Sequence, residues 1–266
     1  MTRAVTRQSL CAVIPAAGHG TRLGGTVPKV MLEIAGGVTV WHLLYRRLRP
    51  WVDHVHVIVS PEGEIPFRRL MDIDMETGEI EHGTVSVSVQ EQPTGMGDAI
   101  FGAAGHWQSY DGILVVWGDQ ANLSSATVGE VVRVHSQVSA RPVLTVPLVP
   151  MPDPYVEYDL ESGELRRVRM SREGDRCRPG GLSDVGVFCL STSSGGLRQS
   201  WERYLAEAVP GAVTGEINFL PFLPYLVGVH GWETRVVPVA DPTEARGINT
   251  RDDLEFARQV FQQCAD

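Results

Sequence analysis

Short apolar runs alternate along this sequence with longer segments whose apolar residues recur at helical spacing. The apolar runs are expected to form buried strands, and they lie at residues 11–14, 52–60, 85–89, 113–117, 142–147 and 232–239. The segments of helical spacing lie at residues 38–50, 61–83, 96–106, 124–137 and 193–208. Strands that alternate with helices predict an α/β fold in which helices flank a mixed, mostly parallel sheet.

One segment departs from this alternation. Three prolines interrupt the pattern within residues 150–154, and residues 155–170 then read as two strands joined at Ser162-Gly163. A serine–glycine pair between two strands is typical of a hairpin turn. The sequence therefore predicts a small β-rich lobe beside the main sheet.

A glycine-rich segment directly follows the first predicted strand. Its glycines, beginning with Gly18 and Gly20, allow the backbone to turn its N–H groups toward an anion. Arg22 and Lys29 add two cations, and Lys29 is the one lysine among 23 lysine and arginine residues. We expect this loop to bind phosphate; the alternative is a solvated loop that retains one lysine by chance.

Asp119 lies just beyond the strongly apolar run at residues 113–117. A carboxylate at the carboxyl end of a buried strand is well placed to hold Mg²⁺ beside substrate phosphates. The alternative is that Asp119 caps the helix predicted at 124–137. The strand-end position favours the metal-binding interpretation.

Gln90 ends the strand predicted at 85–89, and two glycines follow it within a short turn. A glutamine amide can bond the edge of a nucleobase, and glycines let a flat ring approach the backbone. We expect a base-binding loop here, with a plain strand-to-helix connection as the alternative.

Six arginines gather after the predicted hairpin turn, at residues 166, 167, 169, 172, 176 and 178. In an acidic chain such a cluster is either a solvated charged face or an anion site, and composition favours neither.

Composition and charge exclude several classes of function. A net charge of −9 argues against a nucleic-acid partner, which needs a broad basic surface. The four cysteines show no C-x-x-C spacing, and His54 and His56 have no third ligand nearby, so we expect no zinc site. No apolar run approaches the length of a membrane span and no signal-peptide core is seen, so we expect a cytoplasmic protein.

The segment AAGHGTRLGGTVPK at residues 16–29 resembles the signature of the sugar-1-phosphate nucleotidyltransferases, above all their amino-sugar uridylyltransferases. In that family a G-x-G-T-R loop is followed five residues later by Pro-Lys. The resemblance implies a Rossmann-like fold, Mg²⁺ as cofactor, and pyrophosphate release from an NTP and a sugar or cyclitol phosphate. It places the nucleotide on Ala16, Ala17, Gly18, Gly20 and Thr21, and assigns catalysis to Arg22 and Lys29.

Three further segments resemble motifs that hold the nucleotide and the metal in this family. A Q-x-x-x-x-G-T-G-H-A type segment implies that Gln90 and Gly95 bind the base, although the residues after Gly95 depart from the pattern. An L-x-x-x-G-D segment implies that Asp119 binds metal and nucleotide. A G-V-N-x-R type turn makes Asn249 the second metal ligand, where an ordinary reading would be a helix N-cap.

The resemblance also implies an acceptor site. Arg169 stands where the uridylyltransferases carry a sugar-binding glutamate, which favours an acceptor with extra negative charge or with different hydroxyls. Either Arg169 or Arg172 would hold the acceptor. Asp184 replaces the asparagine of an I-N-T-G strand at residues 182–188, and Glu216 fills the glutamate of a G-E-x-Y-L-T-D segment.

The expected organisation is a single nucleotidyltransferase domain over residues 1–266, in which residues 150–185 and 210–246 form the acceptor-binding lobe. Without hexapeptide repeats, acetyl transfer is not expected. Association of several copies is left open. The alternatives are a non-catalytic ligand-sensing domain and a metal-dependent glycosyltransferase, although Asp119-Gln120-Ala121 lacks the Asp-x-Asp of the latter.

Overall fold

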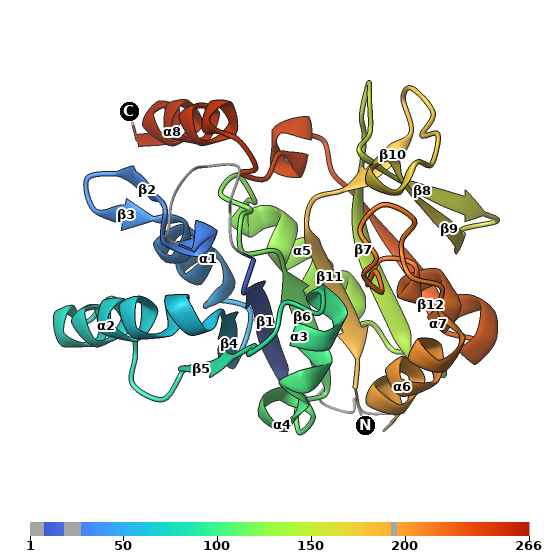
Figure 1. The fold of residues 1–266 in the computed structure, drawn as a ribbon, viewed down its shortest axis with the longest axis horizontal. Coiled ribbons are helices and arrows are strands. Elements are labelled where there is room, and N and C mark those ends of the chain that lie inside the picture. The colour runs from blue at the N-terminus through green and yellow to red at the C-terminus, as the bar shows by residue number, and fades with distance from the viewer. Residues whose placement is uncertain (1–7, 19–27, 193–195, 266) are drawn as a thin grey trace, which may run out of the picture.

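The computed structural model describes residues 8–18, 28–192 and 196–265, and its centre is an eight-stranded sheet (Figure 1). The strands are β1 (Leu10–Ala16), β4 (His54–Val59), β5 (Val85–Val89), β6 (Gly112–Val116), β7 (Val143–Pro150), β10 (Leu182–Asp184), β11 (Val187–Ser191) and β12 (Glu233–Pro238). Their order is β10-β7-β11-β6-β1-β4-β5, with β12 paired to β7. Strands β4 and β6 pair with β1 in parallel and β5 pairs with β4 in parallel, whereas β11 runs antiparallel to β6 and β7. The predicted mixed, mostly parallel sheet is confirmed.

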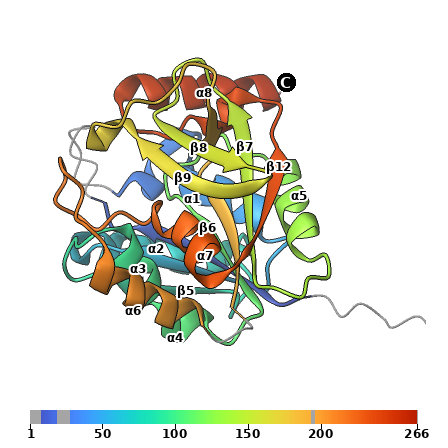
Figure 2. The same ribbon diagram turned by 90° about the vertical axis from the view of Figure 1, so that its right-hand side faces the viewer.

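Helices cover both faces of the sheet. They are α1 (Val40–Leu48), α2 (Pro61–Thr77), α3 (Met96–Gly102), α4 (Ala104–Trp107), α5 (Ser125–His135), α6 (Leu197–Glu207), α7 (Phe222–His230) and α8 (Arg251–Ala265). Ile14 of β1 lies in one apolar cluster with Trp41 of α1, whereas its neighbour Val13 lies in the other with Trp107 of α4. Figures 1 and 2 accordingly place α3 and α5 on opposite faces of the sheet. None of the helices in the described ranges combines the length and the hydropathy that a membrane-spanning segment requires.

The helix starts carry their own capping residues. The Ser60 side chain accepts from the Gly63 N–H, and Pro61 occupies the first turn of α2. The Ser124 hydroxyl accepts from the Thr127 N–H at 3.0 Å and so begins α5. The alternative that Asp119 caps this helix is therefore excluded.

The predicted hairpin is present. Strands β8 (Val156–Glu161) and β9 (Glu164–Met170) pair antiparallel, and both turn residues have positive φ, 53° at Ser162 and 83° at Gly163. Figure 2 shows this hairpin standing out from the main sheet, beside β7 and β12. A second short ribbon, β2 (Glu33–Ala35) with β3 (Val38–Thr39), precedes α1.

The single strand expected at residues 182–188 is wrong, because the chain forms two short strands, β10 and β11, with a break between them. Gly186 has a φ of +74° at the break, and a Cβ there would lie only 2.4 Å from Nε2 of Gln120. The buried Gln120 side chain thus occupies the space that a regular strand side chain would need. The break lies beside the loop that carries Asp119.

Candidate active site

The candidate site lies where β1 and β6 end. β1 pairs with β4 on one side and with β6 on the other, so the strand order reverses at β1. Ligands of open α/β sheets bind at the carboxyl ends of strands at such a reversal. The two strand ends touch, because a Cβ on Gly118 would lie 3.1 Å from Cβ of Ala16.

Part of the predicted phosphate loop is visible there. Ala16 and Ala17 are buried at the end of β1, and Gly18 after them is exposed. Gly20, Thr21 and Arg22 lie outside the described residues, so their roles remain predictions.

Lys29, Asp119 and Asn249 meet at this edge of the sheet. The Lys29 ammonium donates to Oδ2 of Asp119 at 2.9 Å and to Oδ1 of Asn249 at 2.7 Å. Lys29 begins the 3₁₀ turn η2 (Lys29–Met31), Asp119 follows β6, and Asn249 precedes α8. The fold therefore brings together three predicted site residues, of which Lys29 and Asn249 are 220 positions apart.

The backbone around Asn249 holds its side chain toward Asp119. The Ile248 N–H donates to the Asp119 carbonyl at 3.0 Å. The Asp253 carboxylate accepts from the N–H groups of Asn249 at 3.1 Å and of Thr250 at 2.9 Å, and the Thr250 hydroxyl accepts from the Asp253 N–H at 3.2 Å. This reciprocal cap uses Thr250 and Asp253, so the N-cap reading of Asn249 is excluded.

The Asp119–Asn249 pair has the right donors for a divalent cation. One carboxylate oxygen and one amide oxygen converge on a single cationic atom, the Lys29 nitrogen. Mg²⁺ binds oxygen ligands and typically takes only one or two carboxylates from the protein, the rest coming from substrate phosphates and water. Among the described residues no cluster of three His, Cys, Asp or Glu side chains could hold a metal ion.

Two polar residues that follow Asp119 have a packing role. The Asn122 amide donates to the Arg246 carbonyl at 3.0 Å. Gln120 is buried against Gly186, as described above. These contacts tie the Asp119 loop to the turn that carries Asn249.

The predicted base loop is shaped by Gln90. Its Nε2 donates to the Gly95 carbonyl at 3.0 Å, and Gly95 has a φ of +115°. A Cβ on Gly95 would lie 3.9 Å from Oε2 of Glu216, so the loop expected to bind the base lies beside a residue expected to bind the acceptor.

The predicted acceptor residues fall into separate environments. Arg172 Nη2 lies 3.7 Å from Oε2 of Glu216, and both side chains are substantially exposed. Asp184 is buried and its Oδ1 accepts from the Gly186 N–H at 2.7 Å. Burial raises the pKa of Asp184, and the charge of Asp119 raises it further.

Arg169 is engaged inside the β8–β9 hairpin. Its Nη2 lies 2.9 Å from Oδ2 of Asp159 and its Nη1 lies 3.5 Å from Oε1 of Glu157. Arg178 pairs with the same two carboxylates. Burial alone would raise the pKa of Glu157, but the hydrogen bonds and charges of these arginines lower it overall. The positive charges of Arg169 and Arg178 are balanced by the negative charges of Glu157 and Asp159. Arg169 is therefore already paired within the protein, which weakens the expected preference for an acceptor with extra negative charge.

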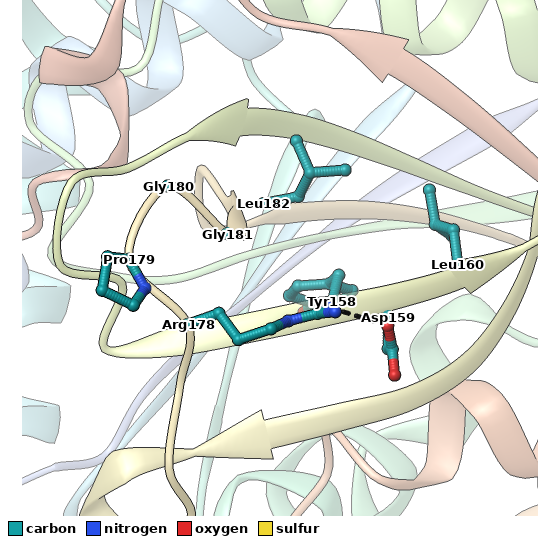
Figure 3. A pocket seen from close by; sticks show the side chains of 8 residues that line it. All are labelled: Tyr158, Asp159, Leu160, Arg178, Pro179, Gly180, Gly181 and Leu182. Atoms are coloured by element: carbon teal, nitrogen blue, oxygen red, sulfur yellow. Dashed lines mark hydrogen bonds and ion pairs between the residues drawn. The ribbon is translucent and has the colours of Figure 1, made fainter.

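A cavity of about 350 Å³ lies beside this ion-pair group, and Figure 3 shows the side chains around it. It is lined by Tyr158, Asp159, Leu160, Arg178, Pro179, Gly180, Gly181 and Leu182. Neither Lys29 nor Asp119 lines it, so it is separate from the group at the strand ends.

Glu173, which closely follows the β8–β9 hairpin, is a further residue near the candidate site that the sequence did not indicate. It ends the 3₁₀ turn η3 (Ser171–Glu173), and its carboxylate accepts from the Val213 N–H at 2.9 Å, the Thr214 hydroxyl at 2.6 Å and the Asn218 amide at 3.2 Å. Hydrogen bonds from Thr214 and Val213 lower the pKa of Glu173 to about 2. Glu173 thus ties the hairpin to the loop that carries Glu216. No motif marks it, because its partners lie 40 or more positions away.

Comparisons with known proteins agree with this geometry. A model of the MobA-like NTP transferase domain matches residues 12–152. The bifunctional protein GlmU of Aquifex aeolicus is 28% identical over 263 residues, covering 94% of this chain and 53% of that protein. GlmU of Desulfitobacterium hafniense strain DCB-2 is 30% identical over 258 residues, covering 95% of this chain and 52% of that protein. The chain thus spans about half the length of the curated relatives it matches.

Solved structures share the fold at low sequence identity. A Bacillus anthracis protein assigned as a glucose-1-phosphate thymidylyltransferase superposes with a TM-score of 0.66 at 15% identity, covering 95% of each chain. The 4-diphosphocytidyl-2C-methyl-D-erythritol synthase of Anaerococcus prevotii superposes with a TM-score of 0.63 at 15% identity, covering 97% of this chain and 98% of that one. The expectation of a Rossmann-like nucleotidyltransferase fold is confirmed. Because the family model covers more than half of the sequence and includes both Lys29 and Asp119, this chain belongs to the family of MobA-like NTP transferase domains.

Proposed function

We propose that this chain couples an NTP to a sugar or sugar-like phosphate and releases pyrophosphate. The observation that carries the proposal is the meeting of Lys29, Asp119 and Asn249 at the carboxyl ends of β1 and β6. A cation beside two oxygen ligands, at the usual ligand-binding edge of such a sheet, suits a reaction between phosphate groups.

For this reaction the protein must align the two phosphate groups and place positive charge beside them. An oxygen of the acceptor phosphate forms a bond to the α-phosphorus, while the bond from that phosphorus to the bridging oxygen of the β-phosphate breaks and the electron pair leaves with pyrophosphate. The acceptor is a phosphate monoester whose second pKa is about 6, so it is ionised at neutral pH and no general base is needed. Two charges ~4 Å apart repel by ~4 kcal/mol at an effective dielectric of ~20, so placing cations between the substrates is the main task.

The proposed roles follow from charge and position. Lys29 stabilises the α-phosphate during transfer, and Arg22 holds the β- and γ-phosphates that leave. Asp119 and Asn249 would hold Mg²⁺, which when bound neutralises charge on phosphate oxygens. Gln90 and Gly95 bind the base, whose edge the Gln90 amide can meet with both a donor and an acceptor.

The acceptor is proposed to lie between the base loop and the β-rich lobe, so that the chain acts as one nucleotidyltransferase unit with residues 150–185 and 210–246 covering the acceptor. The exposed Arg172–Glu216 pair beside Gly95 supports this position. Glu216 and Asp184 would bond hydroxyl groups, and Arg172, which is less tightly paired than Arg169, would contact the acceptor phosphate. A neighbour whose name contains glucose 1-phosphate is consistent with a sugar phosphate as acceptor.

A matrix assay tests the function. The four common NTPs and dTTP are each combined with sugar and cyclitol phosphates in the presence of Mg²⁺, and pyrophosphate release is measured. We expect one NTP and one acceptor class to give turnover that is lost in Asp119→Asn. Nucleotide binding without turnover in any combination would instead indicate a ligand-sensing domain. Consumption of a nucleotide sugar without pyrophosphate would indicate a glycosyltransferase.

A further inference from the structure

The ammonium of Lys29 stands between the two oxygens that the proposed function gives to a divalent cation. It lies 2.9 Å from Oδ2 of Asp119 and 2.7 Å from Oδ1 of Asn249, distances of short, charge-assisted hydrogen bonds. The side chains of Lys29 and Asp119 are only 23% and 19% exposed, so bulk water screens the pair incompletely.

Contacts that do not involve Lys29 hold the segments that carry the two oxygens. The Asp119 carbonyl accepts from the Ile248 N–H, and the Asn249 N–H is held by Asp253. Gly247 packs against the Asp119 carboxylate, since a Cβ there would lie 3.0 Å from Oδ1. The Lys29 side chain, by contrast, is a flexible four-carbon stem. The oxygens are therefore the fixed part of the site and the ammonium is the part that can leave.

An ammonium and a divalent ion cannot occupy this position together. Mg²⁺ binds oxygens at about 2.0–2.1 Å, so an ion bound to both oxygens would lie in contact with the Lys29 nitrogen. Charges of +1 and +2 in such close contact, and only partly screened by water, repel each other strongly.

We propose that Lys29 is a built-in competitor for the cation site: its ammonium neutralises Asp119 in the nucleotide-free protein, and a divalent cation enters only as Lys29 moves to the nucleotide phosphates. The proposal rests on the proposed function, because the phosphates are the new partner of the ammonium. Metal and nucleotide then strengthen each other's binding. The nucleotide phosphates draw Lys29 away from the metal ligands, and the metal replaces Lys29 as the cation beside Asp119. Metal alone binds weakly, and the site stays closed to divalent cations until substrate arrives.

Binding of Mn²⁺ alone tests the competition without any turnover. Free Mn²⁺ is measured by electron paramagnetic resonance in titrations of the full chain, with folding of each variant checked by circular dichroism. We expect Lys29→Met to bind Mn²⁺ about tenfold more tightly than the wild type, a change of 1.4 kcal/mol. The matched variant Lys29→Arg keeps the positive charge and should stay close to the wild type. Asp119→Asn should abolish the tighter binding when combined with Lys29→Met. Equal or weaker Mn²⁺ binding by Lys29→Met, including no measurable binding, overturns the proposal.

Lys29 can also be observed directly, because it is the one lysine of the sequence. Lysine-selective ¹³C labelling therefore gives a single side-chain signal in an NMR spectrum. We expect Mg²⁺ together with the NTP chosen by the matrix assay to shift this signal strongly, and Mg²⁺ alone to shift it little. A large shift with Mg²⁺ alone at low concentration contradicts the competition. A chain that shows this exchange but releases no pyrophosphate would retain the inference about Lys29 and refute the transferase function.

Discussion

Gly247 packs directly on the carboxylate of Asp119: a Cβ on Gly247 would lie 3.0 Å from Oδ1 and 3.2 Å from Nε2 of Gln120. The same segment continues through Ile248, whose N–H donates to the Asp119 carbonyl, to Asn249. The absence of a side chain at position 247 thus lets the two proposed metal ligands approach each other.

Gly247→Ala is expected to move the Asp119 carboxylate by a few tenths of an ångström and to lower kcat/KM about tenfold or more, because transfer depends on alignment. Gly228→Ala is the matched control, since a Cβ on Gly228 in α7 meets nothing within 4 Å. Steady-state kinetics of both variants, with melting temperatures, check the prediction. Unchanged kcat/KM in Gly247→Ala would show that the close packing has no role in alignment.

Lys29→Met should lower kcat by about 100-fold or more while the melting temperature changes little, because a transition-state cation is lost from a partly exposed position. Amine-modifying reagents offer an independent measurement, since Lys29 carries the one lysine amine of the chain. Inactivation should follow modification of Lys29, and nucleotide with Mg²⁺ should protect. Near-normal turnover of Lys29→Met is incompatible with the proposed role.

Glu173→Ala should loosen the loop that carries Glu216, because three groups of that loop lose their common acceptor. Hydrogen–deuterium exchange should show faster exchange at the amides of Val213 and Thr214. The acceptor KM should rise while the NTP KM stays the same. Glu164→Ala, which removes an exposed ion pair with Arg166 at the far end of the hairpin, is the control and should leave both quantities unchanged. An unchanged exchange rate at Val213 in Glu173→Ala would refute the prediction.

Gly186→Ala should destabilise the protein by about 2 kcal/mol or more, because alanine tolerates positive φ poorly and its Cβ would collide with Gln120. Gly180→Ala separates the two causes: its φ is +76°, but a Cβ there meets nothing within 4 Å, so it should cost only about 1 kcal/mol. Urea unfolding measures the free energies. Adding Gln120→Ala to Gly186→Ala should recover part of the lost free energy of unfolding. Equal losses of that free energy in Gly186→Ala and Gly180→Ala would show that Gln120 moves away and no collision remains.

The free energy of unfolding should fall as pH drops from 6.5 toward 5. Burial, with the neighbouring charges of His106 and His54, lowers the pKa of His56 to about 3, and burial lowers that of His135 to about 4. The unfolded chain takes up protons below its ordinary histidine pKa of about 6.5 that the folded chain does not, so each histidine costs up to about 1.4 kcal/mol per pH unit.

His56→Gln should make this dependence shallower, whatever its effect at pH 7, whereas the exposed His82→Gln should not. Urea unfolding at pH 7.0, 6.0 and 5.0 gives the slopes and stays above the range in which most carboxylates titrate. If the slope of His56→Gln equals that of the wild type, His56 is not the source.

Local pattern was enough for most of the fold and for part of the site. The apolar and alternating runs correctly predicted β1, β4, β5, β6, β7 and β12, because a strand in a sheet needs apolar residues either along its whole length or on one face, and both patterns are local. The glycine-rich loop with its single lysine, and the aspartate after the most apolar strand, stand out as candidates because phosphate and metal binding require those residue types at strand ends.

Tertiary structure decided what each charge meets. Arg169 looked available for an acceptor, but the pairing of β8 with β9 places it against the carboxylates of Glu157 and Asp159. Glu173 gave no signal at all, because its partners come from a distant loop.

One physical cause separates what local sequence pattern predicts from what tertiary structure decides. Strand and helix formation depend on near neighbours, whose order along the sequence is known. The partner of a polar side chain depends on which remote segments the sheet brings within about 3 Å, as it does for Lys29 and Asn249, which are 220 positions apart. The sequence therefore determined the strands, the helices and the candidate residues of the site, and only the tertiary structure decided which of those residues touch.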